Sequence, residues 1–328
     1  MDSLIFALTA VSPIIILVAL GYLIKRLRLI NGDFVRMANK LVFRLFLPAM
    51  LFLNIYNIES FSGIRYGYVI YSVSIIFALF LIALVCSGFV TKKRERRGVM
   101  MQVSFRSNYA LVGIPLAVSL FGESGGAAAS LLSAISIPIF NILAVISLSL
   151  FGDGEKKPTV KKIILGIIKN PLIESIALGL VCLAVRAVFV NGGIGFRLSD
   201  IDVMFTVLKY LSNVATPLAL IMLGAQFEFS AIARLKNEII FGTAMRVVAA
   251  PLIGVGVAYL FFRNNFSGAE FATFVALFAT PVAVSSVPMA QEIGGDTELA
   301  GQYVVWTTLL SAISIFLCTF LLRAAGIF

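Results

Sequence analysis

Long apolar stretches separated by short polar segments run through the whole 328-residue chain. About 18 or more consecutive apolar residues can cross a bilayer as a helix. We expect a transmembrane helix at each of ten such stretches, numbered here as spans 1 to 10: 4–24, 35–57, 67–90, 99–121, 126–150, 172–190, 203–226, 239–262, 271–291 and 299–322. The pattern therefore predicts an all-α integral membrane protein.

Basic residues are distributed unevenly between the two sides of these spans. Of the 26 Lys and Arg residues, 18 lie in or beside the connections after spans 1, 3, 5 and 7, and only Arg65, Arg197, Arg263 and Arg323 lie on the opposite side. Because cytoplasmic loops are enriched in Lys and Arg, we expect a multi-pass protein of the plasma (inner) membrane with both termini outside. Basic residues follow the first stretch and do not precede it, so we expect span 1 to be retained and not cleaved as a signal peptide.

Several motifs occur twice along the chain in the same order. The paired features are PIIILVALG at Pro13 and PLIESIALG at Pro171, Lys40 eight residues before Pro48 and Lys209 eight before Pro217, Gly122-Glu123-Ser124 after Pro115 and Gly295-Asp296-Thr297 after Pro288, and LLSAISI at 131–137 and 309–315. Four matches in one order indicate an internal repeat.

The repeat predicts two five-span halves, residues 1–151 and 163–328, joined by a short basic cytoplasmic loop at 152–162. Because five is odd, the second half enters the membrane from the opposite face. An inverted-topology repeat of this kind is typical of secondary transporters, although repeats also occur in channels and in other membrane proteins.

Spans 4 and 9 contain residues that interrupt helices. They are Gly113 and Pro115 in span 4, and Pro281 and Pro288, seven residues apart, in span 9. Proline inside a helix costs about 3 kcal/mol, and a broken helix frees backbone groups for a ligand. We expect both spans to be broken near a substrate site; ordinary proline kinks are the alternative.

Two arginines, Arg106 and Arg246, are predicted deep within spans 4 and 8. Such an arginine costs roughly 2.5–3.5 kcal/mol unless it faces water or a polar partner. No Asp or Glu is predicted near the middle of any span, so an anionic substrate is a candidate partner, and a carboxylate matches the guanidinium fork. The alternative is that the side chains reach the headgroups.

Small polar residues beside the predicted breaks complete the candidate substrate site. They are Ser107 and Asn108 in span 4, and Ser285 and Ser286 in span 9. Asn108 and the backbone near Pro115 are expected to bind substrate, the two serines to donate hydroxyl groups, and Arg246 to give electrostatic support, with Arg106 as a further contributor.

The composition argues against enzyme chemistry and against a cofactor or metal site. The chain is 60% hydrophobic and 13% charged, against about 45–50% and 25% in soluble domains, and it contains no His. The three Cys lie in apolar stretches without CxxC spacing, and neither a Ser–Lys nor an acid-pair arrangement stands out. We therefore expect no enzyme activity, no cofactor and no metal site.

Charge near the span ends is expected to face solvent and lipid. We interpret the net charge of +10 as attraction to anionic membrane lipids and expect no nucleic-acid partner. The basic run at 91–97 and the acidic cluster of Glu292, Asp296 and Glu298 are both expected to be solvated loops, with a coupling-ion site as the alternative for the acids.

Around the predicted breaks of spans 4 and 9, the sequence resembles the crossover motifs of the auxin efflux carrier family, at which two interrupted helices cross. The resemblance is to its bacterial members in particular. The resemblance covers essentially the whole chain. It is carried by Leu47-Pro48-Ala49, Phe105-Arg106-Ser107-Asn108 with Gly113-Ile114-Pro115, Arg246 followed by Pro251, and Thr280-Pro281 through Ser286 with Gly294-Gly295-Asp296.

The resemblance implies two inverted five-helix repeats in which helices 4 and 9 cross at their breaks. It implies a scaffold of spans 1, 2, 6 and 7, and a mobile unit of spans 3–5 and 8–10 that carries substrate by an elevator displacement. Plant members export indole-3-acetate, and bacterial relatives are associated with malonate and malate. The plant carriers have a long loop after span 5, and their second crossover proline does not align with Pro288; auxin is accordingly a poor candidate.

The sequence thus predicts a secondary transporter for small organic anions, mono- or dicarboxylates, working by alternating access. A sodium-coupled symporter of the bile-acid type and a channel or sensor are the alternatives. The expected partners are the anion and membrane lipids, and a homodimer is one possible assembly.

Overall fold

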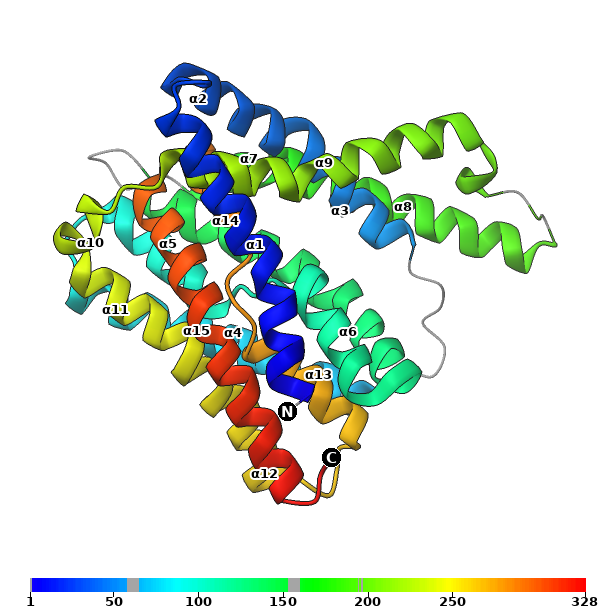
Figure 1. The fold of residues 1–328 in the computed structure, drawn as a ribbon. Helices are drawn as coiled ribbons and strands as arrows, with labels where there is room; N and C mark the ends of the chain where they lie inside the picture. The colour runs from blue at the N-terminus through cyan, green and yellow to red at the C-terminus, as the bar shows by residue number, and fades with distance from the viewer. Residues whose placement is uncertain (1, 58–64, 153–159, 194, 196) are drawn as a thin grey trace.

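The computed structural model describes residues 2–57, 65–152, 160–193, 195 and 197–328, and these are almost entirely helical (Figure 1). The described residues form no β-strand, and their one isolated bridge pairs Ser107 with Val282. Of the predicted loop 152–162, residues 153–159 lie outside the described residues.

The first half of the chain begins with α1 and ends with the long helix α6. Its elements are α1 (Asp2–Arg26), α2 (Gly32–Leu41), the π-helix η1 (Val42–Phe46), α3 (Leu47–Tyr56), α4 (Tyr66–Val90), α5 (Arg94–Phe105), the π-helix η2 (Tyr109–Gly113) and α6 (Ile114–Phe151).

The second half begins with a short helix, α7, and ends with α15. Its elements are α7 (Val160–Ile168), α8 (Pro171–Asn191), the 3-10 helix η3 (Leu198–Asp200), α9 (Asp202–Gln226), α10 (Ser230–Arg234), α11 (Lys236–Ala244), the π-helices η4 (Met245–Ala249) and η5 (Leu252–Gly256), α12 (Val257–Phe262), α13 (Gly268–Phe278), α14 (Ser286–Ile293) and α15 (Thr297–Ala324).

Seven helices in the described residues are long and apolar enough to cross a membrane, as expected of a multi-pass membrane protein. They are Gly32–Tyr56, Tyr66–Val90, Tyr109–Phe151, Pro171–Val190, Asp202–Gln226, Lys236–Phe262 and Thr297–Ala324. The third of these is 43 residues long, and non-helical backbone angles at Phe121 and Gly122 divide it in two.

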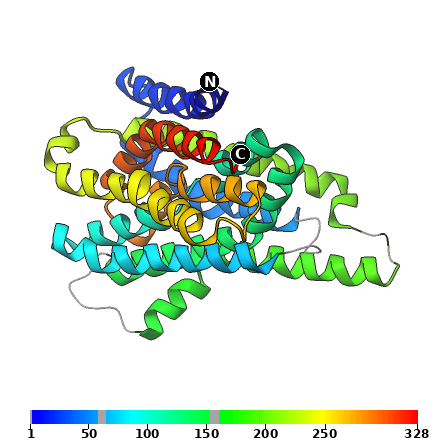
Figure 2. The same cartoon turned by 90° about the horizontal axis from the view of Figure 1, so that it is seen from below.

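Helices α1 and α9 pack unusually closely, and glycine permits the approach. A Cβ atom on Gly21 would lie 2.0 Å from the carbonyl oxygen of Ile221, and one on Gly224 would lie 1.9 Å from that of Val18. Helix α8 packs on α3 in a similar way, with Gly179 facing Ile55. Figure 2 shows α1 along one edge of the molecule, next to α15.

The centre of the fold is formed by α13, whose residues from Glu270 to Phe278 are all buried. Its phenylalanines Phe271, Phe274 and Phe278 are fully enclosed, and the helix packs chiefly on α6. The N-terminus is fixed by Ser267 and Glu270, which form a capping box. The interruption of predicted span 9 follows directly after this buried helix. It therefore lies inside the protein and not against lipid.

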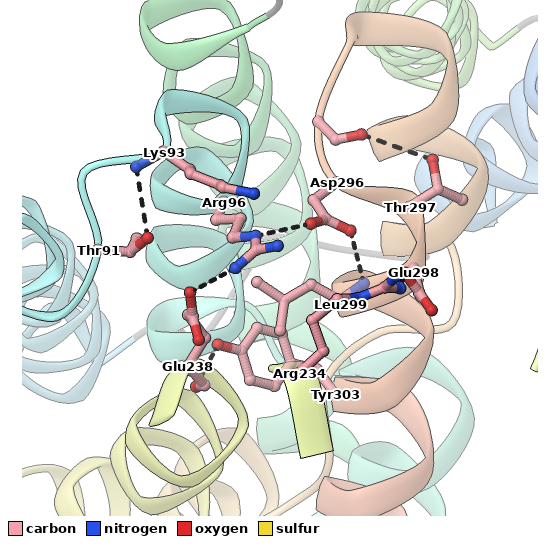
Figure 3. A network of polar contacts seen from close by, with 11 residues as sticks. Thr91, Lys93, Arg96, Arg234, Glu238, Asp296, Thr297, Glu298, Leu299 and Tyr303 are labelled. Carbon is pink, nitrogen blue, oxygen red and sulfur yellow. Dashed lines mark hydrogen bonds and ion pairs between the residues drawn. The ribbon is translucent and has the colours of Figure 1, made fainter. Parts of the chain in front are cut away.

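Arg96 joins the charged segments near the start of α5 and α15 in an ion-pair network, so the expectation of a solvated loop is wrong for the acidic cluster and for Arg96 (Figure 3). In the basic run, Lys92 and Lys93 precede α5 in a non-helical segment and are exposed. Arg96, in the first turn of α5, pairs with Glu238 of α11 at 2.8 Å and with Asp296 at 3.1 Å. Asp296 also caps α15 through the Leu299 N–H. The hydrogen bonds and charges of these two acids outweigh burial and raise the pKa of Arg96.

Glu292 and Glu298, the other two residues of the predicted acidic cluster, also have basic partners. Glu298 forms an ion pair with Arg234 of α10, and Glu292 lies 3.6 Å from Arg44 of η1. Sequence patterns do not reveal these partners, because they lie more than 60 residues away along the chain.

Candidate substrate site

Two interrupted helices meet at the candidate site. Helix α5 ends at Phe105 and helical structure resumes at Tyr109; α13 ends at Phe278 and α14 begins at Ser286. The two non-helical segments run antiparallel: Ser107 bridges to Val282, and the Asn108 N–H donates to the Pro281 carbonyl at 2.7 Å. The Val282 N–H donates to Thr307 Oγ1 at 3.1 Å. The hydrogen bond between the two segments thus replaces part of the backbone hydrogen bonding that is lost where the helices stop. Buried non-helical backbone requires such partners.

A cavity opens beside this crossing, between it and the helices α3, α6 and α9. The space that no atom occupies amounts to about 540 Å³, part of it open at the mouth. Its polar lining residues are Asn54, Arg106, Ser107, Asn108, Asn141, Thr216 and Ser285, and the rest of the lining is largely apolar, including Met50, Leu51, Ile137 and Phe140. Small ligand sites commonly combine an apolar wall with a few polar groups in this way.

Arg106 is the only charged side chain among the described residues that line the cavity. It is 3% exposed, and its guanidinium donates to Asn141 Oδ1 at 3.0 Å and to Ser285 Oγ at 2.7 Å. Another N–H is directed at the sulfur of Met289. All three partners are neutral, and no carboxylate in the described part of the chain pairs with Arg106. The cavity wall therefore carries an uncompensated positive charge.

The three residues that follow Arg106 in the chain, all of which line the cavity, carry polar atoms without hydrogen-bond partners in the described structure. Ser107 Oγ, Asn108 Nδ2 and Tyr109 OH are buried and have no partner in the part of the chain that the structure describes. The Asn108 amide nitrogen can only donate, and the two hydroxyls can donate as well. Buried polar atoms without partners are costly, so a bound acceptor at this position would be stabilised.

Arg246 lies elsewhere and has a different environment. It is completely buried, is absent from the cavity lining, and donates from Nε to the Thr280 carbonyl at 2.8 Å and from Nη2 to the Leu277 carbonyl at 2.7 Å. Leu277 is in the last turn of α13 and Thr280 lies two residues beyond its end, and a cation at the C-terminal end of a helix is favoured by the helix dipole. Arg246 thus supports the interrupted helix at the crossing.

The two serines also differ from each other. Ser285 lines the cavity and accepts from Arg106, whereas Ser286 begins α14 behind it and does not line the cavity. Ser286 Oγ is buried without a partner among the described residues.

The helix breaks do not coincide with all of the residues expected to cause them. Span 4 leaves the helix at Arg106–Asn108, and Gly113 and Pro115 lie in the helical segment that follows. A π-helix precedes Pro115, and its wider turn compensates for the backbone hydrogen bond that the proline nitrogen cannot donate. The chain therefore continues as a helix. In span 9, Pro281 lies in the break, but Pro288 lies within the first turn of α14, where its missing N–H costs little.

Three lining residues, Asn54, Asn141 and Thr216, were not among the predicted site residues. Asn141 is a polar residue inside a long apolar span, which is a signal in the sequence. Only the packing of α6 on the crossing shows that it faces Arg106.

Comparison with known proteins agrees with a transport role. The chain is similar to an uncharacterized transporter of Methanothermobacter thermautotrophicus, with 24% identity over 93% of this chain and 95% of the relative. It is also similar to one of Methanocaldococcus jannaschii, with 26% identity over 92% and 94%. A Rhizobium meliloti protein named "Putative malonate transporter" is 23% identical over 97% of this chain and 96% of its own length.

The model of one protein family, described as membrane transport protein, matches residues 6–319, nearly the whole chain. The transport family is of the auxin efflux carrier type that the crossover motifs indicated. The chain therefore belongs to this family of membrane transport proteins.

Proposed function

We propose that this protein is a secondary transporter for small organic anions, which bind in the cavity at the crossing of the two interrupted helices. The observation that carries the proposal is the buried guanidinium of Arg106, which lines the cavity and has only neutral partners in the described structure. A substrate carboxylate would supply the missing charge and accept from Arg106, from Asn108 Nδ2 and from Ser107 Oγ.

Each site residue then has a distinct role. Arg106, Ser107 and Asn108 bind the anion directly, and Ser285 orients Arg106 and contributes a hydroxyl at the cavity wall. Ser286, which does not line the cavity, begins α14 next to Ser285. Arg246 acts indirectly by holding the end of α13.

The proposed architecture is ten transmembrane helices in two inverted repeats, 1–151 and 163–328. Taking α5 with the chain to Phe121 as span 4, and α13 with α14 as span 9, gives ten spans from the observed helices. Two features support the repeat. Left-handed glycines, Gly122 (φ 56°) and Gly294 (φ 84°), follow the second half of each broken span, and the close pair α1–α9 has its counterpart in α8–α3.

We further propose an elevator mechanism. The cavity is bounded on one side by α3 and α9, from the expected scaffold, and on the other by the crossing and α6, from the expected mobile unit. A displacement of one set past the other would carry the bound anion across. Both termini lie at the same end of the molecule (Figure 1), which is consistent with the proposed orientation with both termini outside the plasma membrane.

The test is transport by purified protein in liposomes, read as charge movement on a solid-supported membrane and as tracer uptake. Malonate is the first substrate to try because of the name of the Rhizobium relative; malate, oxalate, lactate and indole-3-acetate follow, each with and without a pH gradient and sodium. We expect saturable transport of at least one of these anions.

The matched variants are Arg106→Gln and Lys209→Gln, which each remove one positive charge. Lys209 is exposed and is not one of the residues that line the cavity. Losing a charged hydrogen-bond donor should raise the half-saturating anion concentration roughly 10- to 100-fold in the first variant and leave the second unchanged. Equal transport by both variants would refute the role of Arg106, strict sodium dependence would favour a symporter, and conductance above carrier rates would favour a channel.

A further inference from the structure

An apolar groove runs along the surface between α15 and the helix that ends with η5 and α12. Its volume is about 1490 Å³, including the space open to the surroundings. Its walls include Leu252 and Leu321, which are 65% and 62% exposed. The Ser314 hydroxyl at its base is already bonded to the Val247 carbonyl at 2.5 Å, so the groove offers an apolar surface with few free polar groups.

Glycine leaves part of this groove empty. A Cβ atom added to Gly256, one of the lining residues, would have no atom within 4 Å. This differs from the glycines of the α1–α9 contact, where a Cβ would meet backbone. The groove is therefore open to the surroundings at Gly256.

Two arginines stand at one end of the groove. Arg263 follows α12, and its guanidinium lies 5.7 Å from the ring centre of Tyr259, a lining residue. Arg323 is in the last turn of α15, between the lining residues Leu322 and Ala324. Figure 1 shows the ends of α12 and α15 close together at the end of the molecule where both termini lie.

The charge on these arginines is unmatched in the described structure. Both side chains are exposed and neither pairs with a carboxylate there, whereas Arg65, another arginine expected on this side, pairs with Glu270 at 3.1 Å. Few basic residues are predicted on this side of the membrane. Two arginines at the end of one apolar groove, without a carboxylate partner among the described residues, therefore favour the binding of an anionic group.

We propose that this groove is a binding site for an anionic phospholipid. One acyl chain lies along the groove against Leu252 and Leu321, and the phosphate group lies between Arg263 and Arg323. The groove supplies apolar contact for any phospholipid, and the arginines supply the preference for a negative headgroup, roughly fivefold for each arginine near a membrane surface.

The test is native mass spectrometry of the purified protein released from nanodiscs that contain equal amounts of phosphatidylglycerol and phosphatidylcholine with the same acyl chains. Wild type should retain phosphatidylglycerol preferentially. The double variant Arg263→Gln/Arg323→Gln should lose most of that preference, a reduction of about 10-fold or more. The control Arg197→Gln/Lys209→Gln removes two other exposed charges and should keep the preference.

A second variant tests the groove itself. Gly256→Leu places a side chain in open space, so it should fill the groove without a clash and reduce retention of both lipids; an unchanged unfolding temperature in detergent shows that the fold is intact. Equal retention of the two lipids by wild type, or unchanged retention in the arginine and glycine variants, would overturn the proposal. A dimer formed through this face and lost in Gly256→Leu would also overturn it, since a second copy would then be the occupant.

Discussion

Arg106 and Arg246 are both buried guanidinium groups in apolar spans, yet they have different partners. Arg246 is held by two backbone carbonyls at the end of α13, while Arg106 is held by side chains at the wall of the cavity. The sequence predicts electrostatic support of the substrate from Arg246, with Arg106 as a further contributor. The contacts favour the reverse order, because only Arg106 lines the cavity.

Arg246→Gln should therefore reduce stability more than substrate affinity. The change removes a charged donor from two carbonyls, and each such hydrogen bond contributes about 1.5–3 kcal/mol. We expect a lower unfolding temperature in detergent, with the half-saturating anion concentration of the folded protein within about threefold of wild type. A large loss of affinity at unchanged stability would instead return Arg246 to the substrate site.

Asn141→Asp should block anion binding by supplying an internal counter-charge. The Asn141 oxygen lies 3.0 Å from Arg106 Nη2, so a carboxylate there would pair with the guanidinium and compete with substrate. We expect transport to fall at least 10-fold while thermal stability stays equal or rises. The control Asn141→Leu removes the amide without adding charge and should transport better than Asn141→Asp; the opposite ranking would contradict the proposed charge balance.

At the scale of elements, the contact between α1 and α9 depends on the absence of side chains. Gly224→Ala would place a Cβ atom 1.9 Å from the Val18 carbonyl oxygen, which forces the two helices apart. Overpacking of this kind costs about 1–3 kcal/mol, so the unfolding temperature should drop. The control Gly166→Ala lies in α7, where a Cβ meets no atom within 4 Å, and should leave the unfolding temperature unchanged or slightly higher. Equal unfolding temperatures for the two variants would contradict this account of the contact.

The interruptions of the two crossing helices are also a property of elements in contact. Span 4 leaves the helix at Arg106–Asn108, where the backbone finds partners in span 9, and not at Gly113 and Pro115. Proline and glycine indicate which spans are weak, but the opposite non-helical segment at the crossing fixes the residues at which helical hydrogen bonds are lost. A sequence contains no local signal for that second choice.

For the whole molecule, polar contacts join helices that belong to the same proposed unit. The Arg96 network joins α5, α11 and α15, all within the unit expected to be mobile (Figure 3). Polar side-chain contacts between that unit and the expected scaffold include those of Gln291 of α14, whose Oε1 accepts from Asn39 of α2 at 2.9 Å, while α1 packs along α15.

Cross-linking this contact should stop transport. With the three native cysteines replaced, Asn39→Cys and Gln291→Cys joined by a short reducible thiol cross-linker would tie scaffold to mobile unit. We expect uptake to fall to background and to recover on reduction. The control pair Val247→Cys and Ser314→Cys, both within the mobile unit, should tolerate cross-linking. Undiminished uptake with the first pair fully joined would exclude an elevator displacement between these elements.

The sequence by itself determined the class of molecule, an all-helical membrane protein, and two spans that are interrupted. These follow from local properties: a bilayer demands long apolar stretches, and proline, glycine and small polar residues weaken particular helices. Motif resemblance added the transport family, which the family match across residues 6–319 confirmed. The tertiary structure alone decided which arginine lines the cavity, that Asn141 holds it, and that the acidic cluster is paired. Those properties depend on contacts between residues distant in the chain, and the hydropathy pattern does not specify which side chains come into contact.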